Sequence, residues 1–202
     1  MSDDYVAKTI ATYDALAEKY AQKFAKYPPV TEWNIFLSKL PEHAKILEAG
    51  CGSGRDSAYF SSKGHDVIGI DLSSKLLAIA KRAVPKAMFK LMDLRKIQFP
   101  GETFDGIWAC ASLLHLKRDE ISPVIHKFYS LLKPNGILFI LMREGVGERE
   151  DVRLYTYVSQ KELIAYLKEA GFSIEKMYTW DQKDLWPERS KKNWIASFSR
   201  KK

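Results

Sequence analysis

The sequence predicts a doubly wound α/β fold built on a mainly parallel, seven-stranded sheet. Between residues 44 and 142, short apolar segments alternate with segments of helix length. The first apolar segment ends in a turn with three alternating glycines, at residues 50–54. Strands that alternate with helices at this spacing form right-handed βαβ units, which place parallel strands side by side with helices on both faces.

Length and composition predict one domain. The chain has 202 residues, of which 46% are hydrophobic and 28% are charged, and these values exclude the disordered and collagen-like classes. We expect a single domain over residues 1–202, with an N-terminal helical lid (1–41), a cofactor-binding core (44–143) and a C-terminal part that completes the sheet (144–202). No apolar run reaches the ~18 residues that a membrane-spanning helix needs, so no membrane association is expected.

Charge and cysteine usage restrict the possible partners. Met1 is followed by acidic residues rather than by a basic and then apolar secretion signal, so we expect a cytoplasmic protein. Cys51 and Cys110 are too isolated for a disulfide framework or a zinc site, and we expect two buried fillers and no metal. The net charge of +7 permits a nucleic acid partner, but the lysines are scattered except at residues 191–192 and 201–202, as on an ordinary solvated surface.

The elements before the glycine turn are helical. Apolar residues at helical spacing predict one amphipathic helix over residues 4–26 and a second over residues 31–40, and prolines follow both. Tyr13 and Tyr20 lie about two turns apart on one face of the first helix, so both phenols could face inward. Ordinary amphipathic packing explains the two tyrosines as well.

After residue 44 the predicted strands and helices alternate along the chain. Strands are expected at residues 44–49, 64–71, 87–92, 104–111 and 137–142, and helices at residues 55–62, 74–83 and 118–132. Residues 145–153 are polar and punctuated by glycines, and a helix over residues 159–170 follows them. Residues 172–180 and 194–199 predict an antiparallel strand pair that completes the sheet.

The predicted topology brings several acidic residues and glycines together at one edge of the sheet. Ligands of open α/β sheets bind beyond the carboxyl ends of the strands, and Glu48, Gly50, Asp71, Asp93 and residues 109–112 all follow or end strands. Glycines permit a close approach of the backbone to a ligand, and the helix that follows directs free N–H groups toward it. We therefore expect a nucleotide or nucleoside site.

The spacing around the glycines argues against a pyrophosphate. A dinucleotide fingerprint would place a small residue at position 55, where Arg55 stands, and the third glycine comes one position early at Gly54. Glu48 would repel a pyrophosphate but would attract an ammonium or sulfonium group. A dehydrogenase that binds NAD remains the less favoured alternative.

The motifs resemble those of the class I, Rossmann-like S-adenosylmethionine-dependent methyltransferases. The resemblance covers roughly residues 44–142 and rests on five pieces in the expected order: Glu48-Ala49-Gly50-Cys51-Gly52-Ser53-Gly54, Ile70-Asp71, Met92-Asp93-Leu94, Phe104-Asp105-Gly106-Ile107 and Leu132-Lys133-Pro134-Asn135-Gly136. It implies S-adenosyl-L-methionine as the cofactor.

The resemblance also implies roles for individual residues. The glycine turn would approach the cofactor, Glu48 would face its ammonium group, Asp71 would accept hydrogen bonds from its ribose, and Asp93 would face its adenine. The full set of implied contacts is Tyr13, Tyr20, Glu48, Gly50, Cys51, Gly52, Gly54, Asp71, Leu72, Asp93, Leu94, Ala109 and Ser112. Two purely structural alternatives remain open: Asp71 could cap the next helix, and Asp93 could be an acidic residue of an ordinary turn.

The sequence gives fewer signals for the residues that bind the methyl acceptor than for those that bind the cofactor. His115, just beyond the fourth strand, is a candidate base, although a packed structural histidine fits equally; Tyr20 is a second catalytic candidate, and Tyr13 and Tyr20 would close over the methyl group. Arg143, Glu144, Arg153 and Tyr155 are candidates to line the acceptor pocket. Arg153 could bind an acidic substrate or form a surface ion pair.

Several acceptor classes are disfavoured. The segment from Ala109 to Ser112 lacks the Asp/Asn-Pro-Pro-aromatic motif of related base-amino methyltransferases, and Cys110 lacks the preceding proline of cytosine-C5 enzymes. We expect methyl transfer to a small molecule by in-line displacement, in a monomer or homodimer. The alternatives are a tRNA-modifying methyltransferase and a non-catalytic S-adenosylmethionine-binding module.

Overall fold

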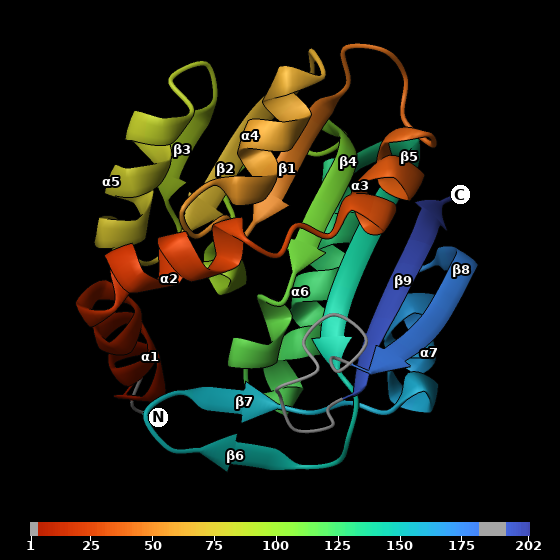
Figure 1. Ribbon diagram of the computed structural model, residues 1–202. Helices are drawn as coiled ribbons and strands as arrows, with labels where there is room; N and C mark the ends of the chain where they lie inside the picture. The colour runs from red at the N-terminus through yellow and green to blue at the C-terminus, as the bar shows by residue number, and fades with distance from the viewer. Residues whose placement is uncertain (1–3, 182–192) are drawn as a thin grey trace.

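One mixed sheet runs through the protein. The structure is a computed structural model that describes residues 4–181 and 193–202 (Figure 1), so the pair Lys191 and Lys192 lies outside the described residues. The strand order is β3-β2-β1-β4-β5-β9-β8. The strands are β1 (Lys45–Ala49), β2 (Asp66–Asp71), β3 (Met88–Leu91), β4 (Phe104–Cys110), β5 (Leu132–Arg143), β8 (Phe172–Asp181) and β9 (Asn193–Lys201).

The pairing confirms the predicted fold class. Strands β1 to β5 pair in parallel, whereas β9 pairs antiparallel with both β5 and β8. Strand β5 begins five positions earlier than predicted. Its pairing with β4 jumps from Leu132 opposite Phe104 to Ile137 opposite Gly106, so the predicted turn at residues 133–136 is an irregular segment inside the strand.

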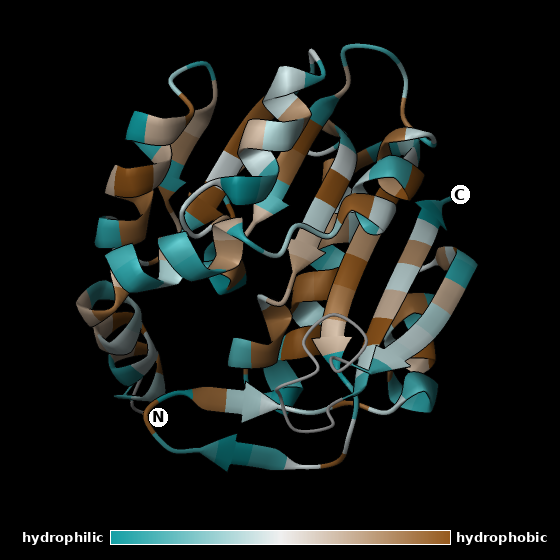
Figure 2. Cartoon of the chain, viewed as in Figure 1, coloured by the Kyte–Doolittle hydropathy of each residue, from teal (hydrophilic) through white to brown (hydrophobic). Residues whose placement is uncertain are grey.

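Helices cover both faces of the sheet. Helices α3 (Val30–Leu37) and α4 (Arg55–Ser62) lie in front of it in Figure 1, α6 (Arg118–Leu131) and α7 (Gln160–Glu169) lie behind it, and α5 (Ser74–Ala83) lies beside β3. The central strands are the most apolar part of the chain (Figure 2), because both of their faces are covered. Trp108 in β4 is fully buried and stacks on Phe139 in β5 at 3.9 Å between ring centroids.

The predicted single helix over residues 4–26 is wrong. The segment forms two helices, α1 (Asp4–Ala15) and α2 (Ala17–Ala25), which are separated at Leu16, whose φ of −112° and ψ of 11° are not helical. Both helices contact α5, so the apolar periodicity continues across the break and hides it in the sequence.

A small hairpin was not predicted in the polar segment after β5. Strands β6 (Glu148–Glu150) and β7 (Leu154–Thr156) pair antiparallel and lie next to α1 beyond the carboxyl ends of the parallel strands (Figure 1). The strands are short and mostly polar, which gives no clear period-2 pattern. We refer to α1, α2, β6 and β7 together as the cover.

Polar contacts join the parts of the cover to one another and to the core. The Thr12 hydroxyl donates to the carbonyl of Val152 at 2.8 Å, and Lys8 pairs with Glu150 at 3.2 Å. Toward the core, Asp14 accepts a hydrogen bond of 2.5 Å from the Ser73 hydroxyl, and Ser73 is also the N-cap of α5. Helix α1 is therefore attached both to the hairpin and to the loop that follows β2.

Candidate cofactor and acceptor site

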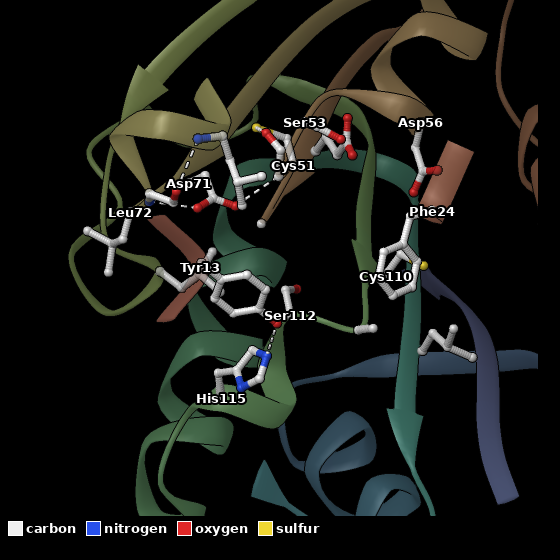
Figure 3. Close-up of a pocket in the computed structure, with 18 of the residues that line it drawn as sticks. Tyr13, Phe24, Cys51, Ser53, Asp56, Asp71, Leu72, Cys110, Ser112 and His115 are labelled. Atoms are coloured by element: carbon white, nitrogen blue, oxygen red, sulfur yellow. Dashed lines mark hydrogen bonds between the residues drawn. The ribbon is translucent and has the colours of Figure 1, made fainter. Parts of the chain in front are cut away.

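A cavity of about 260 Å³ lies between the cover and the carboxyl ends of the parallel strands (Figure 3). Most of the residues predicted for the site line it: Tyr13, Tyr20, Glu48, Gly50, Cys51, Gly52, Asp71, Leu72, Asp93, Leu94, Ser112 and His115. Two predicted residues do not line it. Gly54 is buried at the start of α4 and Ala109 is fully buried inside β4, so neither faces the cavity.

The three glycines of the turn have different surroundings. A Cβ on Gly50 would lie 2.3 Å from the Cβ of Ser112, so only glycine lets the ends of β1 and β4 approach this closely. A Cβ on Gly54 would lie 3.0 Å from the Cβ of Ala80, so Gly54 lets the residue before α4 approach α5 closely. A Cβ on Gly52 would meet only Leu76, at 3.9 Å, which leaves open space on the cavity side of the turn.

Asp71 connects the glycine turn to the loop after β2. One carboxylate oxygen accepts from the N–H of Gly52 and the other from the N–H of Ser73, both at 2.8 Å. Burial raises the pKa of Asp71, and the backbone N–H groups only partly oppose that rise. The helix-capping alternative does not describe it, because the N-cap of α5 is Ser73, whose hydroxyl accepts from the N–H of Leu76.

Glu48 is a buried acid at the floor of the cavity. It accepts a hydrogen bond from the Ser57 hydroxyl, and its pKa lies well above the usual range because of burial and the nearby carboxylate of Asp56. Asp56 is itself held by Arg55 at 2.5 Å and by the indole N–H of Trp108 at 2.7 Å. Arg55 pairs with Asp56, and none of the ion pairs of the described residues includes Glu48, so a cationic group beside Glu48 would stabilise its carboxylate form.

Asp93 has a structural role at the edge of the cavity. It accepts from the N–H of Arg95 at 2.8 Å at the start of a short 3-10 helix (Leu94–Lys96), and it pairs with the Arg95 guanidinium at 2.6 Å. Burial alone would raise the pKa of Asp93, but these two Arg95 contacts outweigh it and hold the pKa below its usual range. The turn alternative is thus present in the structure, and the carboxylate lines the cavity as well.

His115 is hydrogen-bonded on both ring nitrogens. Its Nδ1 lies 2.7 Å from the carbonyl oxygen of Leu154 in β7, and its Nε2 lies 2.6 Å from the Tyr13 hydroxyl (Figure 3). A carbonyl only accepts, so we assign the proton to Nδ1, and Nε2 then accepts from Tyr13. Burial lowers the pKa of His115 to about 4, so the ring is neutral near pH 7.

The predicted acceptor residues lie behind the cavity wall. None of Arg143, Glu144, Arg153 and Tyr155 is among the residues that line the cavity. Instead, the Arg153 guanidinium lies over the rings of Tyr13, Tyr20 and Tyr155, at 4.8, 5.8 and 5.3 Å from their centroids. The first two of these tyrosines form part of the wall.

Other lining residues were missed by sequence reasoning. Phe24 continues the helical stripe of Tyr13 and Tyr20, so the same periodicity could have identified it. Trp180 and Trp194 reach the cavity from β8 and β9, and no local pattern connects these strands with the glycine turn. Cys110 is a half-buried lining residue rather than a buried filler. The described residues contain no group of three or more His, Cys, Asp or Glu side chains placed to hold a metal ion.

The fold and this site define a Rossmann-like α/β protein with a glycine turn and a cavity at the carboxyl ends of the parallel strands. The sequence model of a family described as "Methyltransferase domain" matches residues 46–136. A candidate methyltransferase from Geobacillus sp. (strain WCH70) is 30% identical over 167 residues, which cover 77% of this chain and 67% of that protein. The chain belongs to the class I S-adenosylmethionine-dependent methyltransferases.

Other relatives differ in what their names say they act on. A phosphoethanolamine N-methyltransferase of Plasmodium falciparum is 27% identical over 191 residues, which are 81% of this chain and 70% of that enzyme. The chain spans 65% of YqeM, a candidate methyltransferase of Bacillus subtilis, and 42% of a malonyl-[acyl-carrier protein] O-methyltransferase of Enterobacter lignolyticus, with 30% identity to each. It thus spans less than two thirds of the length of these two relatives.

Solved structures share the fold. A TehB-like methyltransferase from Corynebacterium glutamicum superposes with a TM-score of 0.73 at 26% identity, over 93% of this chain and 99% of that one. The 1,6-didemethyltoxoflavin-N1-methyltransferase of Burkholderia thailandensis, solved with bound 1,6-didemethyltoxoflavin and S-adenosylhomocysteine, superposes with a TM-score of 0.78 at 23% identity, over 98% of this chain and 89% of that one. Among the described residues, no helix is long and apolar enough to cross a membrane.

Proposed function

We propose that this protein transfers a methyl group from S-adenosyl-L-methionine to a small-molecule acceptor in the cytoplasm. The observation that carries the proposal is one cavity with two chemically different ends. One end has the glycine turn with Glu48 and Asp71, and the other has the phenols and imidazole of the cover and of the turn after β4. A nucleoside donor and an acceptor can therefore meet beneath the same cover.

The residues at the first end fit the cofactor. The buried Glu48 carboxylate lacks a full positive counter-charge and would hold an ammonium group, and the open space at Gly52 would accept the nucleoside. Each oxygen of Asp71 uses one lone pair on a backbone N–H and keeps another for a ribose hydroxyl. Asp93 and Leu94 would lie along the adenine, and Ser112, whose buried hydroxyl has no partner, would face the methionyl part.

The residues at the second end would orient the acceptor. The bound cofactor supplies an electrophilic methyl group on a sulfonium, so the protein mainly has to position the acceptor and exclude water. The hydrogen bond from Tyr13 to His115 Nε2 directs the lone pairs of the Tyr13 oxygen away from the imidazole, and the Tyr20 hydroxyl lies 3.4 Å from that oxygen. Because the pKa of His115 is low, His115 suits the role of holding Tyr13 better than that of a strong base.

A macromolecular acceptor is the second candidate. A tRNA (carboxymethyluridine(34)-5-O)-methyltransferase of Arabidopsis thaliana is 30% identical over 151 residues, and the net charge of +7 would favour an RNA partner. The contacts between α1 and the hairpin favour a small molecule instead, because they cover the second end of the cavity.

Calorimetric titrations with S-adenosylhomocysteine and with NAD test the cofactor assignment. We expect binding of S-adenosylhomocysteine alone, and tight NAD binding would overturn the assignment. Methyl-labelled S-adenosylmethionine is then incubated with the protein and either a metabolite panel or bulk tRNA. Label on a metabolite supports the proposal, whereas micromolar, salt-sensitive tRNA binding with label on the RNA supports the second candidate. No turnover on either would indicate a binding module.

A further inference from the structure

Two arginines of the described chain differ from all the others by having no carboxylate partner. Side-chain nitrogens of the remaining described arginines lie within 4.0 Å of a carboxylate oxygen: Arg55, Arg82, Arg95, Arg118, Arg149 and Arg200. None of the ion pairs of the described residues includes Arg143 or Arg153. The surface ion-pair alternative for Arg153 is therefore not found in the part of the chain that the structure describes.

The unpaired guanidiniums are partly buried. Nε and Nη1 of Arg153 and Nε of Arg143 are shielded from solvent and have no hydrogen-bond partner. Arg143 lies over Tyr155 and Trp194 at 5.3 and 5.1 Å from the ring centroids, and Arg153 lies over the same Tyr155 at 5.3 Å. The two arginines thus flank one tyrosine.

The aromatic rings attract the charge but leave Nε and Nη1 of Arg153 and Nε of Arg143 without an acceptor. A ring face attracts a guanidinium electrostatically but offers no lone pair to its N–H donors. A guanidinium stays protonated at any pH that the protein experiences, so the donors cannot be removed by loss of a proton. The planar fork of N–H groups matches a carboxylate or a phosphate, each of which presents two oxygens side by side.

The position of the pair relates it to the acceptor end of the cavity. Tyr13 and Tyr20 beneath Arg153, and Trp194 beneath Arg143, all line the cavity. The lining near the glycine turn is acidic, with Glu48, Asp56 and Asp71, and it also includes Arg55, which pairs with Asp56. Arg143 and Arg153 therefore lie behind aromatic residues of the cavity wall, whereas these acids line the cavity itself.

We propose that the methyl acceptor carries an oxyanion, a carboxylate or a phosphate, which Arg153 binds with Arg143 beside it. This inference rests on the proposed function. Tyr20 is partly exposed and lines the cavity, and its ring centroid lies 5.8 Å from the Arg153 guanidinium, so a rotation of Tyr20 would open a path from the cavity to Arg153. The acceptor's anionic group then replaces the aromatic contact with charged hydrogen bonds.

Matched small probes test this inference. Benzoate, phenyl phosphate and neutral benzamide are titrated into the protein, with and without saturating S-adenosylhomocysteine, and chemical shifts or heats are recorded. The titrations are repeated with Arg153→Gln and Arg153→Lys. The control is Arg149→Gln, an exposed arginine on the same hairpin. The dissociation constant for S-adenosylhomocysteine confirms that each variant is folded.

We expect at least one of the two anions to bind to the wild-type protein more tightly than benzamide, and the stronger anion identifies the acceptor's group as carboxylate or phosphate. Arg153→Gln should weaken that binding at least tenfold, Arg153→Lys should restore part of it, and Arg149→Gln should leave it unchanged. Equal binding of benzamide, no anion binding, or an unchanged affinity in Arg153→Gln would overturn the inference. Failure of S-adenosylhomocysteine to bind would instead overturn the proposed function, and the titrations without it would still report on Arg153.

Discussion

Nε2 of His115 lies 2.6 Å from the hydroxyl oxygen of Tyr13, although 102 positions separate the two residues in the chain. The other ring nitrogen of His115 reaches the carbonyl of Leu154 in the hairpin. One imidazole therefore connects helix α1, the turn after β4 and strand β7. Its hydrogen bonds determine where the Tyr13 phenol lies with respect to the acceptor end of the cavity.

Replacement of Tyr13 by phenylalanine tests this connection. Tyr13→Phe leaves the buried Nε2 without a donor, which costs about 1–3 kcal/mol. If the phenol orients the acceptor in the transition state, methyl transfer should fall about 5- to 150-fold. The measurement is turnover alongside the affinity for S-adenosylhomocysteine. Tyr157→Phe, away from the cavity, is the control, and equal activity of both variants would show that the phenol does not act on the acceptor.

The neutral state of His115 predicts a pH-dependent stability. Its pKa is about 4 when folded and about 6.5 when unfolded, so the unfolded chain binds more protons between these values. This contribution to stability is complete above pH 6.5 and is lost as the pH falls toward 4. In urea denaturation, the difference in unfolding free energy between wild type and His115→Gln should shrink from pH 7 to pH 4.5. A constant difference would contradict the low folded pKa.

Replacement of Asp71 tests the ribose assignment. Asp71→Ala removes the proposed charged acceptor of the ribose hydroxyls and should weaken S-adenosylhomocysteine by about 1.5–3 kcal/mol. Asp66→Ala, an exposed acid at the start of the same strand, should bind normally. Calorimetry measures both. Unchanged affinity of a folded Asp71→Ala would refute the ribose role.

The raised pKa of Glu48 predicts proton release on cofactor binding. Burial favours the protonated acid, whereas a bound ammonium group favours the carboxylate. The affinity for S-adenosylhomocysteine should therefore fall as the pH decreases from 8 to 5. Binding heats in buffers of different ionisation enthalpy should reveal the released proton. Glu48→Gln should bind more weakly and lose most of this dependence; an equal slope in both proteins would assign the proton to another group.

Two glycine variants separate packing from binding. Gly54→Ala places a Cβ 3.0 Å from that of Ala80 at a φ of +80° and should lower the unfolding free energy by about 1–3 kcal/mol. Gly52→Val extends toward open space on the cavity side and should abolish cofactor binding, and its φ of +51° adds a backbone strain that also lowers the unfolding free energy. Denaturation and calorimetry on both variants measure the two effects. The reverse pattern would mean that the roles of the two glycines are exchanged.

The end of the cavity that we propose for the cofactor was predictable as a cluster of residues because its signals are local. Glu48, Gly50 and Asp71 end strands or follow them directly, and parallel strands bring their carboxyl ends to one edge whatever the tertiary details. The glycine spacing alone could not show that Gly54 packs against Ala80, because that contact depends on α5.

The end of the cavity that we propose for the acceptor was less predictable, because it is formed by contacts between residues distant in sequence. The break at Leu16 occurs within an unbroken apolar periodicity, and the hairpin has only three residues in each strand. Trp194 reaches the cavity from the penultimate strand in the sheet order. The burial of Arg153 among tyrosines from α1, α2 and β7 also requires the assembled cover.

The hydrogen bond between Asp14 and Ser73 has an energetic consequence for ligand binding. It joins α1 to the loop whose backbone Asp71 holds, so an event that orders this loop also favours the docked position of α1. Thermodynamic reciprocity then requires that a molecule bound beneath α1 strengthen binding at the Asp71 loop by the same factor. We therefore expect the proposed donor and acceptor sites to bind cooperatively, and we expect Asp14→Ala, which removes this hydrogen bond, to uncouple the two affinities.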